Sequence, residues 1–207
     1  MSEVTADTGE TGIGAPVRRR EDLRFITGNG NYTNDINQAG QLYGVFCRSP
    51  YARARINSID TDEALSLPGV VAVYTGQEMV DDGIGDLPCG WLVKSKDGSD
   101  MLSSPHPPLA ASVANYVGEP YALVVAESIH EAKQGAESVF ADFEELDAVV
   151  DLSSATVSES IYEGIPHNLA YDWALGDEDA TRMAFAKAAH VTTLELVNNR
   201  LIPNAIE

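Results

Sequence analysis

The stretch from Tyr121 to Asp151, YALVVAESIHEAKQGAESVFADFEELDAVVD, decides the expected fold. It opens with YALVVAE, an apolar run that is typical of a buried strand. Apolar residues then recur at helical spacing from Ile129 to Phe140, with charged residues on the opposite face, which predicts an amphipathic helix. Residues 140–151 return to a strand pattern. The stretch is therefore a strand, helix, strand unit whose helix must cover one face of a sheet.

Three more strands and two short helices are predicted before this unit. The strands are LYGVFCRS at 42–49, ARINSID at 54–60 and VVAVYT at 70–75. The last of these is a continuous apolar run of the kind that is buried on both faces of a sheet. Asp60 with Glu63, and Thr75 with Glu78, have the spacing of a helix capping box. Together these elements indicate an α+β fold with a mixed sheet and covering helices.

Other segments before the unit are predicted to be irregular. Residues 1–15 are small, polar and acidic, which is typical of a flexible lead. The arginine-rich and glycine-rich residues that follow, including Arg18, Arg19 and Arg20, predict an extended arm rather than a helix. The arm is expected to form ion pairs with another subunit or domain. Segment 81–108 predicts a long surface excursion that serves either a site or a subunit contact.

The residues after Leu152 indicate a second region. SSATVSES at 153–160 is typical of a linker. A short helix is predicted from Asp177 to Ala189, and a strand from His190 to Asn199. The apolar side chains of that strand need a partner sheet, which does not follow in the sequence given. We therefore expect the sequence to be part of a longer protein whose second domain has barely begun.

Composition limits the classes of partner. The 32 acidic and 13 basic residues give a net charge of -19, which repels phosphate backbones and anionic lipids, so neither nucleic acid nor a membrane is an expected partner. The sequence has no apolar run of roughly 18 residues, and its first residues do not resemble a signal peptide. Two distant cysteines, Cys47 and Cys89, indicate neither a disulfide framework nor a zinc site. We expect a cytoplasmic protein.

Several motifs, in order, are similar to the opening of molybdenum hydroxylase large subunits, the family of xanthine, aldehyde and aerobic carbon monoxide dehydrogenases. The motifs are RREDLRFITGNGNYTNDI, GQLYGVFCRSPYARARINSIDTDEALSLPGVVAVYTG, YVGEPYALVVAES, ADFEELDAVVD, PHNLAYDWALGD and AAHVTTLELVNNRLIPNAIE. The last two most resemble the carbon monoxide dehydrogenase branch. The resemblance implies a flexible lead at residues 1–15, an α/β-hammerhead domain at 16–152, and a linker with the truncated start of a molybdopterin-binding domain at 153–207.

For the complete enzyme, the resemblance implies oxidation or hydroxylation with water-derived oxygen at a molybdenum held by molybdopterin cytosine dinucleotide. It also implies an iron-sulfur small subunit with 2Fe-2S clusters, an FAD medium subunit, and a dimer of heterotrimers. The family's catalytic glutamate would lie beyond Glu207, so no catalytic residue is assigned in this chain. The chain alone is expected to be inactive and to hold no cofactor.

The turn Gly118-Glu119-Pro120 is the candidate for a functional role. A turn that directs a strand end toward a cofactor funnel and a plain structural turn have the same sequence pattern, so these three residues are substrate-funnel candidates with both interpretations open. Other motifs favour structural interpretations. The Gly-x-Gly pairs, the paired acids and the four scattered histidines have neither the context of a phosphate loop nor the spacing of metal ligands.

Three functions stay open at this stage. The first is a fragment of a molybdenum oxidoreductase acting on carbon monoxide, an aldehyde or an N-heterocycle. The second is a hammerhead module that binds or assembles without redox chemistry, because a fold does not by itself carry a function. The third is an unrelated small-molecule α/β enzyme. The gene sequence beyond residue 207 would separate them.

Overall fold

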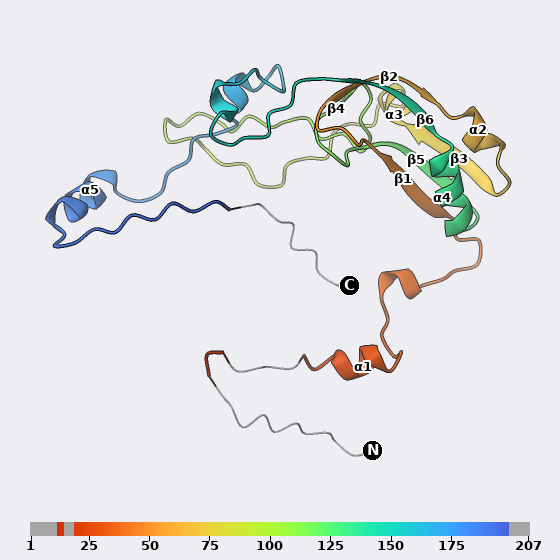
Figure 1. The fold of residues 1–207 in the computed structure, drawn as a ribbon, viewed down its shortest axis with the longest axis horizontal. Coiled ribbons are helices and arrows are strands. Elements are labelled where there is room, and N and C mark those ends of the chain that lie inside the picture. Colours follow the sequence, from red (N-terminus) through yellow and green to blue (C-terminus); the bar gives the residue numbers. More distant parts are fainter. Residues whose placement is uncertain (1–11, 15–18, 199–207) are drawn as a thin grey trace, which may run out of the picture. The chain divides into compact units, whose positions relative to one another are not determined.

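The computed structural model describes residues 12–14 and 19–198 of the chain. Residues Gly40–Leu194 form one compact unit, and the described residues outside it are treated separately. Within the unit, helices accompany two small antiparallel sheets (Figure 1). This arrangement confirms the α+β class.

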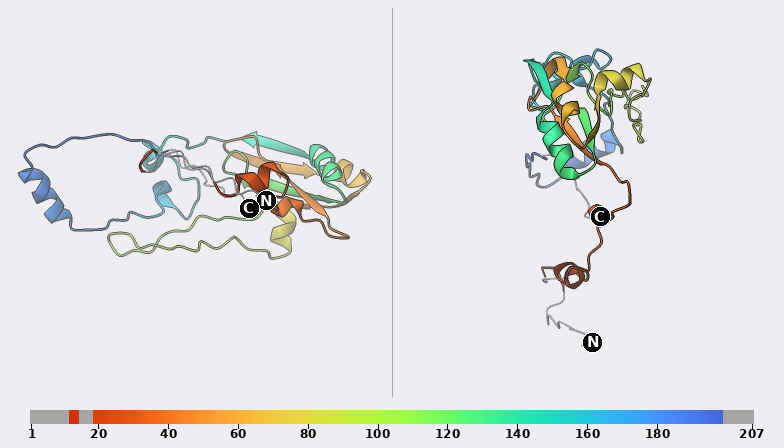
Figure 2. Two further views of the ribbon diagram at one scale, coloured as in Figure 1. Left: turned by 90° about the horizontal axis from the view of Figure 1, so that it is seen from below. Right: turned by 90° about the vertical axis from the view of Figure 1, so that its right-hand side faces the viewer.

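The first sheet has β5 (Pro120–Ala126) at its centre, between β1 (Tyr43–Arg48) and β3 (Val70–Thr75). Both neighbours run antiparallel to β5. The amphipathic helix α4 (Ile129–Glu137) lies against these strands, as two views show (Figures 1 and 2). The prediction that this helix covers one face of a sheet is confirmed.

α4 approaches this sheet closely because Gly135 has no side chain. A Cβ at this position would lie 2.8 Å from Val124 Cγ1 and 3.0 Å from Val70 Cγ2. On the same face, the Cys47 thiol lies 3.6 Å from the Ala136 carbonyl oxygen. The core of the unit lies here and beneath the second sheet; its buried members are Cys47, Ile56, Ala64, Val73, Ala110, Tyr121, Ala122, Val124 and Val139.

The second sheet has β2 (Ala54–Asp60) between β4 (Val113–Ala114) and β6 (Phe140–Glu145), again with antiparallel pairing. In place of the expected mixed sheet, there are thus two antiparallel sheets. The reason is that β5 and β6, which α4 connects, belong to different sheets. A strand, helix, strand unit makes a parallel pair only when both strands join one sheet, and the apolar pattern does not specify this.

β3 is less buried than its apolar sequence predicts. Val73 is 8% exposed, but Val71 and Tyr74 are 52% and 43% exposed. The prediction of burial on both faces is wrong because β3 is an edge strand of a three-stranded sheet that α4 covers on one face. A continuous apolar run does not reveal how many layers enclose it.

The two predicted capping boxes differ in outcome. The one at α3 (Gly76–Asp81) is confirmed: Thr75 Oγ1 accepts a hydrogen bond from the Glu78 N–H, and the Glu78 carboxylate accepts one from the Thr75 N–H at 2.7 Å. The one at Asp60 is wrong. α2 (Asp62–Ser66) begins one residue later than expected, and Asp60 Oδ1 instead accepts from the Asp62 N–H at 3.0 Å.

Outside the compact unit, α1 (Asp22–Ile26) and a 3-10 turn, η1 (Thr33–Asp35), precede the first sheet. The expectation of an extended arm is wrong for α1, because local contacts favour a helical turn. Arg19 pairs with Asp22 at 3.0 Å, an acid in the first turn of the helix. The Phe25 and Tyr32 rings stack with centroids 5.2 Å apart. Arg18, part of the expected ion-pair arm, lies outside the described residues.

Residues 82–112 form the long irregular excursion that the sequence predicts. Its middle folds back on itself, with an isolated bridge between Lys94 and Asp100. It also reaches residues that are about 70 positions later. The Leu102 N–H donates to the Ala170 carbonyl at 2.9 Å, and Lys96 pairs with Asp172 at 2.6 Å.

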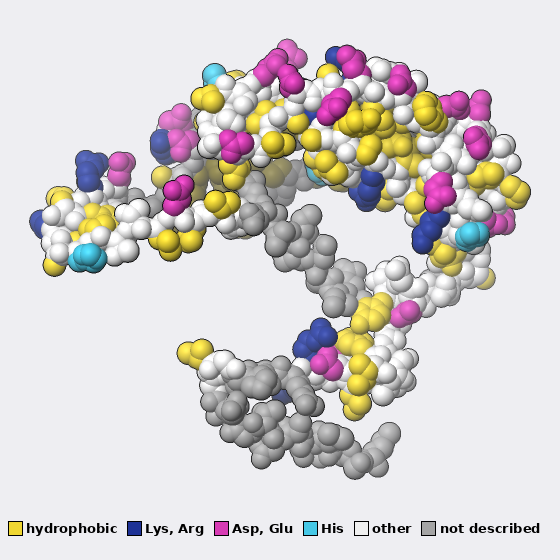
Figure 3. Space-filling view, viewed as in Figure 1, with side chains coloured by type: hydrophobic (Ala, Val, Ile, Leu, Met, Phe, Trp, Pro, Cys, Tyr) yellow, Lys and Arg dark blue, Asp and Glu magenta, His cyan; other side chains and the backbone are white. Residues whose placement is uncertain are grey.

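The chain after β6 contains two 3-10 turns, η2 (Ala155–Val157) and η3 (Pro166–Asn168), and the helix α5 (Glu178–Lys187). α5 is confirmed, but the expected strand from His190 is not formed in the described part, which reaches residue 198; Asn199 lies outside it. Every residue from Tyr171 to Leu194 is exposed, and Figure 3 shows apolar side chains on the surface of this region. A strand without a neighbour has no ladder to join.

None of the helices in the described ranges combines the length and the apolar character needed to cross a membrane. The boundary expected near residue 152 stays a prediction.

Candidate functional site

The candidate turn Gly118-Glu119-Pro120 is tied to the end of β1 by backbone hydrogen bonds. The Gly118 N–H donates to the Ser49 carbonyl at 2.8 Å, and the Ser49 N–H donates to the Glu119 carbonyl at 2.9 Å. Arg48 Nη1 donates to the Gly118 carbonyl at 2.8 Å. Gly118 has a φ of +89°, a backbone conformation that favours glycine, and Pro120 begins β5. The turn is therefore fixed on the sheet.

Glu119 is a buried carboxylate, only 5% exposed. Its Oε2 accepts a hydrogen bond from the Asn115 backbone N–H. Burial raises the pKa of Glu119 above its ordinary value, against the opposing effects of backbone hydrogen bonds from Asn115 and Tyr116 and of the His106 charge. The side chain thus closes the loop from Asn115 to Gly118 from within, and it does not face solvent.

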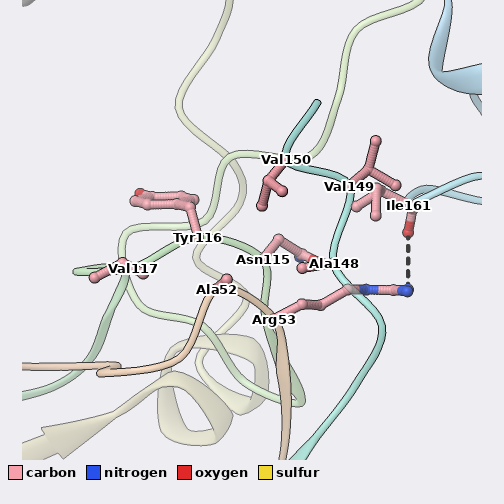
Figure 4. A pocket seen from close by; sticks show the side chains of 9 residues that line it. All are labelled: Ala52, Arg53, Asn115, Tyr116, Val117, Ala148, Val149, Val150 and Ile161. Atoms are coloured by element: carbon pink, nitrogen blue, oxygen red, sulfur yellow. Dashed lines mark hydrogen bonds between the residues drawn. The ribbon is translucent and has the colours of Figure 1, made fainter. Parts of the chain in front are cut away.

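A pocket of about 230 Å³ lies beside this loop (Figure 4). Arg53 stands at its wall, where Nη2 donates to the Ile161 carbonyl at 3.5 Å, a long bond, and Nη1 donates to the Asp147 carbonyl at 3.2 Å. The lining residues are Ala52, Arg53, Asn115, Tyr116, Val117, Ala148, Val149, Val150 and Ile161. The lining is mostly apolar, and Arg53 and Asn115 contribute its charged and amide side chains.

A second pocket of about 310 Å³ shares Asn115, Val149 and Ile161 with the first. Its other residues include Tyr162. Burial raises the pKa of Tyr162, with a further contribution from the nearby Glu119 charge. Asn115 thus lines both pockets, and its backbone N–H donates to the Glu119 carboxylate.

Asn168 holds the far wall of the second pocket together. Its Nδ2 donates to the carbonyls of Ala155 and Glu159 at 2.9 and 3.0 Å, and its Oδ1 accepts from the Ile161 N–H at 2.7 Å. Its backbone is left-handed, with a φ of +54°, a conformation that asparagine tolerates better than most residues. These three bonds make residues 155–168 a locally ordered segment.

Two buried polar atoms at the pocket wall have no hydrogen-bond partner in the structure, Arg53 Nε and Asn115 Oδ1. They mark the polar part of this wall, since buried polar groups in proteins are usually hydrogen-bonded.

The described residues do not provide a donor set for a metal. They contain no group of three or more His, Cys, Asp or Glu side chains that could hold an ion. Cys47 is buried, and burial raises the pKa of its thiol to about 11, so it is a poor metal ligand and a poor nucleophile. Cys89 is exposed in the long excursion. None of these residues is therefore assigned to a metal centre, and no chemical step is derived through one.

That the turn Gly118-Glu119-Pro120 serves a substrate funnel stays a prediction, and the sequence analysis did not single out the polar residues of the pockets beside it. Asn115, Tyr162 and Asn168 come from three different segments, which the fold brings together. Only Asn168 lies in a motif with a recognisable signal, the Pro166-His167-Asn168 run, where proline and asparagine favour a turn.

Comparison with known proteins defines the family. Residues 27–147, more than half of the chain, match the family described as aldehyde oxidase and xanthine dehydrogenase, a/b hammerhead domain. The chain belongs to this family, that of the molybdenum hydroxylase large subunits, and residues 27–147 are its hammerhead domain.

Three relatives illustrate the range of the family. The nicotine 6-hydroxylase large subunit of Paenarthrobacter nicotinovorans is 36% identical over 184 residues, which cover 87% of this chain and 21% of that protein. The xanthine dehydrogenase molybdenum-binding subunit of Escherichia coli O157:H7 is 28% identical over 144 residues, 69% of this chain and 18% of that protein. The structure of reconstituted CO dehydrogenase from Oligotropha carboxidovorans has a TM-score of 0.65 and 32% identity, covering 86% of this chain and 23% of that one.

The chain thus spans about a fifth to a quarter of the length of these relatives. It is homologous to the amino-terminal region of molybdenum hydroxylase large subunits.

Proposed function

We propose that this chain serves as the amino-terminal hammerhead region of the large subunit of a molybdenum-dependent oxidoreductase. In this role it would act on no substrate by itself, and it would form part of the wall of the substrate funnel and a docking surface for the rest of the enzyme. The complete enzyme would oxidise carbon monoxide, an aldehyde or an N-heterocycle. Its molybdopterin cofactor, when bound elsewhere in the subunit, would supply the transfer of a water-derived oxygen.

The observation that carries this proposal is the unburied apolar surface from Tyr171 to Leu194. Trp173, Leu175 and Phe185 are 55%, 86% and 60% exposed, and α5 has no buried residue. A globular protein rarely leaves so many large apolar side chains along one segment in water. Burial of these side chains by a further part of the enzyme would supply the favourable free energy that they lack here.

The chain's own residues would position the funnel wall. The turn Gly118-Glu119-Pro120 is held on the first sheet, and it presents the exposed Tyr116 and Val117 side chains at the pocket rim. A wall of this kind excludes water and orients a substrate without taking part in the chemistry. Glu119, being buried, would support the wall from behind and would not contact the substrate.

The partners proposed for the complete enzyme are an iron-sulfur small subunit and an FAD medium subunit, in a cytoplasmic dimer of heterotrimers. A hammerhead module that assembles without redox chemistry is the second candidate, because the exposed apolar surface supports docking in either case.

A complementation experiment tests the proposal. The chain would be co-produced with a carbon monoxide dehydrogenase large chain that lacks its own hammerhead region, together with the two companion subunits. We expect the chain to co-purify with a molybdenum-loaded complex, and the chain alone to contain no stoichiometric molybdenum and to turn over none of the three substrate classes.

The variant Phe185→Asp should weaken this association by at least about 10-fold, because it places a charge on a surface that must be desolvated. Leu65→Asp, an equally drastic change at an exposed site on α2, is the matched control and should associate normally. Molybdenum or turnover in the isolated chain would refute the proposal. Association without restored redox activity would favour the assembly module.

A further inference from the structure

We propose that Asn29 and Gly30 form a modification site, at which the asparagine side chain deamidates spontaneously and the product disrupts the end of helix α1. This is the only Asn-Gly pair in the sequence. The inference goes beyond the proposed function and does not depend on it.

Packing explains why glycine follows Asn29. The Phe25 and Tyr32 rings stack on each other, and the Gly30 backbone lies against them. A Cβ at position 30 would lie 2.8 Å from Phe25 Cδ1 and 3.5 Å from Tyr32 Cε2, so a larger residue would have to displace the Phe25 ring. Because glycine has no Cβ, the peptide nitrogen of residue 30 is left without steric protection.

Both reacting groups are accessible. Asn29 is exposed, and among the described residues the Gly30 N–H donates to no acceptor. The Asn29 amide is held only locally, by bonds from its Nδ2 to Thr27 Oγ1 at 3.0 Å and to the Thr27 carbonyl at 3.4 Å. Exposed hydrogen bonds compete with water and add little net stability, so the side chain can turn toward Gly30.

The reaction needs only water. The peptide nitrogen of Gly30 loses its proton and attacks Asn29 Cγ. A new C–N bond forms, the bond from Cγ to the side-chain nitrogen breaks, and ammonia leaves. Water then opens the resulting succinimide ring. Opening at one carbonyl gives aspartate in an ordinary peptide linkage, and opening at the other gives isoaspartate, in which the former side-chain carbonyl carries the main chain. No electrons are exchanged, and the rate should rise with pH because the attacking nitrogen must be deprotonated.

The Asp97-Gly98 pair, which can form the same ring by losing water, lacks these conditions. The Gly98 N–H donates to the Ser95 carbonyl at 2.9 Å, so its nitrogen is not free to attack. Asp97 Oδ1 accepts from the Ser99 hydroxyl at 2.7 Å and from the Ser99 N–H at 2.9 Å. These two bonds lower the pKa of Asp97 and favour its unreactive carboxylate form. The pair is therefore an internal control.

The modification would reach the helix because Asn29 belongs to its cap. α1 ends in a Schellman motif: the Gly28 N–H donates to the Phe25 carbonyl at 3.1 Å, and the Asn29 N–H donates to the Arg24 carbonyl at 2.9 Å. Gly28 has the left-handed backbone of this motif, with a φ of +73°. Isoaspartate inserts a methylene into the main chain between the Asn29 Cα and the Gly30 nitrogen. The cap and the contact of Gly30 with the Phe25 ring then no longer have the spacing that both need.

Peptide mapping of the whole chain, after incubation in mildly alkaline buffer, tests the chemistry. We expect the peptide with Asn29 to gain the mass of an amide-to-acid conversion and to separate into aspartate and isoaspartate forms. The other asparagines of that peptide, none of which precedes a glycine, should stay amides. In urea the Asn29 rate should rise by no more than about 10-fold, the effect of losing the Thr27 bonds. The Asp97-Gly98 peptide should stay a single species until urea unfolds the chain.

NMR spectroscopy of the same samples tests the structural consequence. In the fresh chain, the Gly30 α protons should show a nuclear Overhauser contact with the Phe25 ring, and the isoaspartate form should lose this contact. Asn29→Gln is the matched control, because a side chain longer by one methylene closes the corresponding ring far more slowly. After the same incubation it should show no conversion and should keep the ring contact.

An Asn29 that stays an amide in the folded chain and converts only in urea would overturn the proposal, because the fold would then protect it. Conversion to isoaspartate with an unchanged contact between Gly30 and Phe25 would overturn the effect on α1. Neither measurement involves molybdenum or a companion subunit. A failure here therefore leaves the family role untouched, and a failure of complementation leaves this site untouched.

Discussion

The packing of α4 on the first sheet leads to a prediction that runs against helix propensity. In an exposed helix, replacing glycine by alanine stabilises by about 1 kcal/mol. At Gly135, however, the added Cβ would lie 2.8 Å from Val124 Cγ1, about 0.6 Å closer than an ordinary contact, and 3.0 Å from Val70 Cγ2. Both neighbours are β-branched and stiff at χ1, and Val124 is fully buried, so neither can move away easily.

Overpacking of this kind costs about 1–3 kcal/mol, which exceeds the gain in propensity. We expect Gly135→Ala to lower the free energy of unfolding by about 1 kcal/mol, the difference between the two effects. Urea denaturation followed by circular dichroism measures this change. Gly164→Ala is the control: no atom lies within 4 Å of its added Cβ, and its effect should stay within about 0.5 kcal/mol.

A double variant makes the test specific to the contact. Val70→Ala removes one of the two clashing methyl groups, so it should cost less in the Gly135→Ala background than alone, with a coupling energy of about 1 kcal/mol. If Gly135→Ala stabilised the chain, or if the two changes were additive, the close approach of α4 to the sheet would be wrong.

The remaining predictions concern charge, cysteine reactivity and local order. Burial raises the pKa of Glu119 in the folded chain above its value in the unfolded chain. The stabilisation that comes from this shift is fully present below the unfolded pKa and is lost as the pH rises through the folded pKa. Denaturation at stepped pH should show this loss in the wild type and not in Glu119→Gln. Cys89 should react with iodoacetamide in the native chain, whereas Cys47, with a pKa of about 11, should react at least about 100-fold more slowly until the chain unfolds; equal rates would contradict its burial. Thr75→Ala should lower the free energy of unfolding by about 1 kcal/mol, because α3 loses its N-cap. Urea denaturation measures this change, with Thr192→Ala as the control, and an unchanged stability would mean that the cap is unimportant.

Local sequence signals predicted the elements of the compact unit better than their arrangement. Ala54–Asp60 and Val70–Thr75 are strands with the bounds that their side-chain pattern indicates, and Thr75 with Glu78 caps a helix as its spacing requires. These features depend on neighbours within a few residues. Whether β5 and β6 share a sheet depends on contacts with β1, β2 and β3, which no local pattern records.

In the candidate site too, features set by neighbouring residues could be predicted, and contacts between distant segments could not. The turn at Gly118 could be found because glycine and proline mark it in the sequence. The burial of Glu119 could not, since a Gly-Glu-Pro run is equally compatible with an exposed acid. Asn115 and Tyr162 are ordinary polar residues in the sequence, and they line the same pocket only because the segment after β6 returns to the loop before β5.

The bonds between the long excursion and residues 170–172 have a consequence for how the chain can be divided. Lys96 forms an ion pair with Asp172, and the Leu102 N–H donates to the Ala170 carbonyl. These two bonds connect a segment that precedes β4 with a segment that follows β6. A truncation at residue 152 would remove Ala170 and Asp172 and leave Lys96 and Leu102 without these partners. A stand-alone version of the hammerhead domain should therefore end after residue 172, so that both bonds are kept.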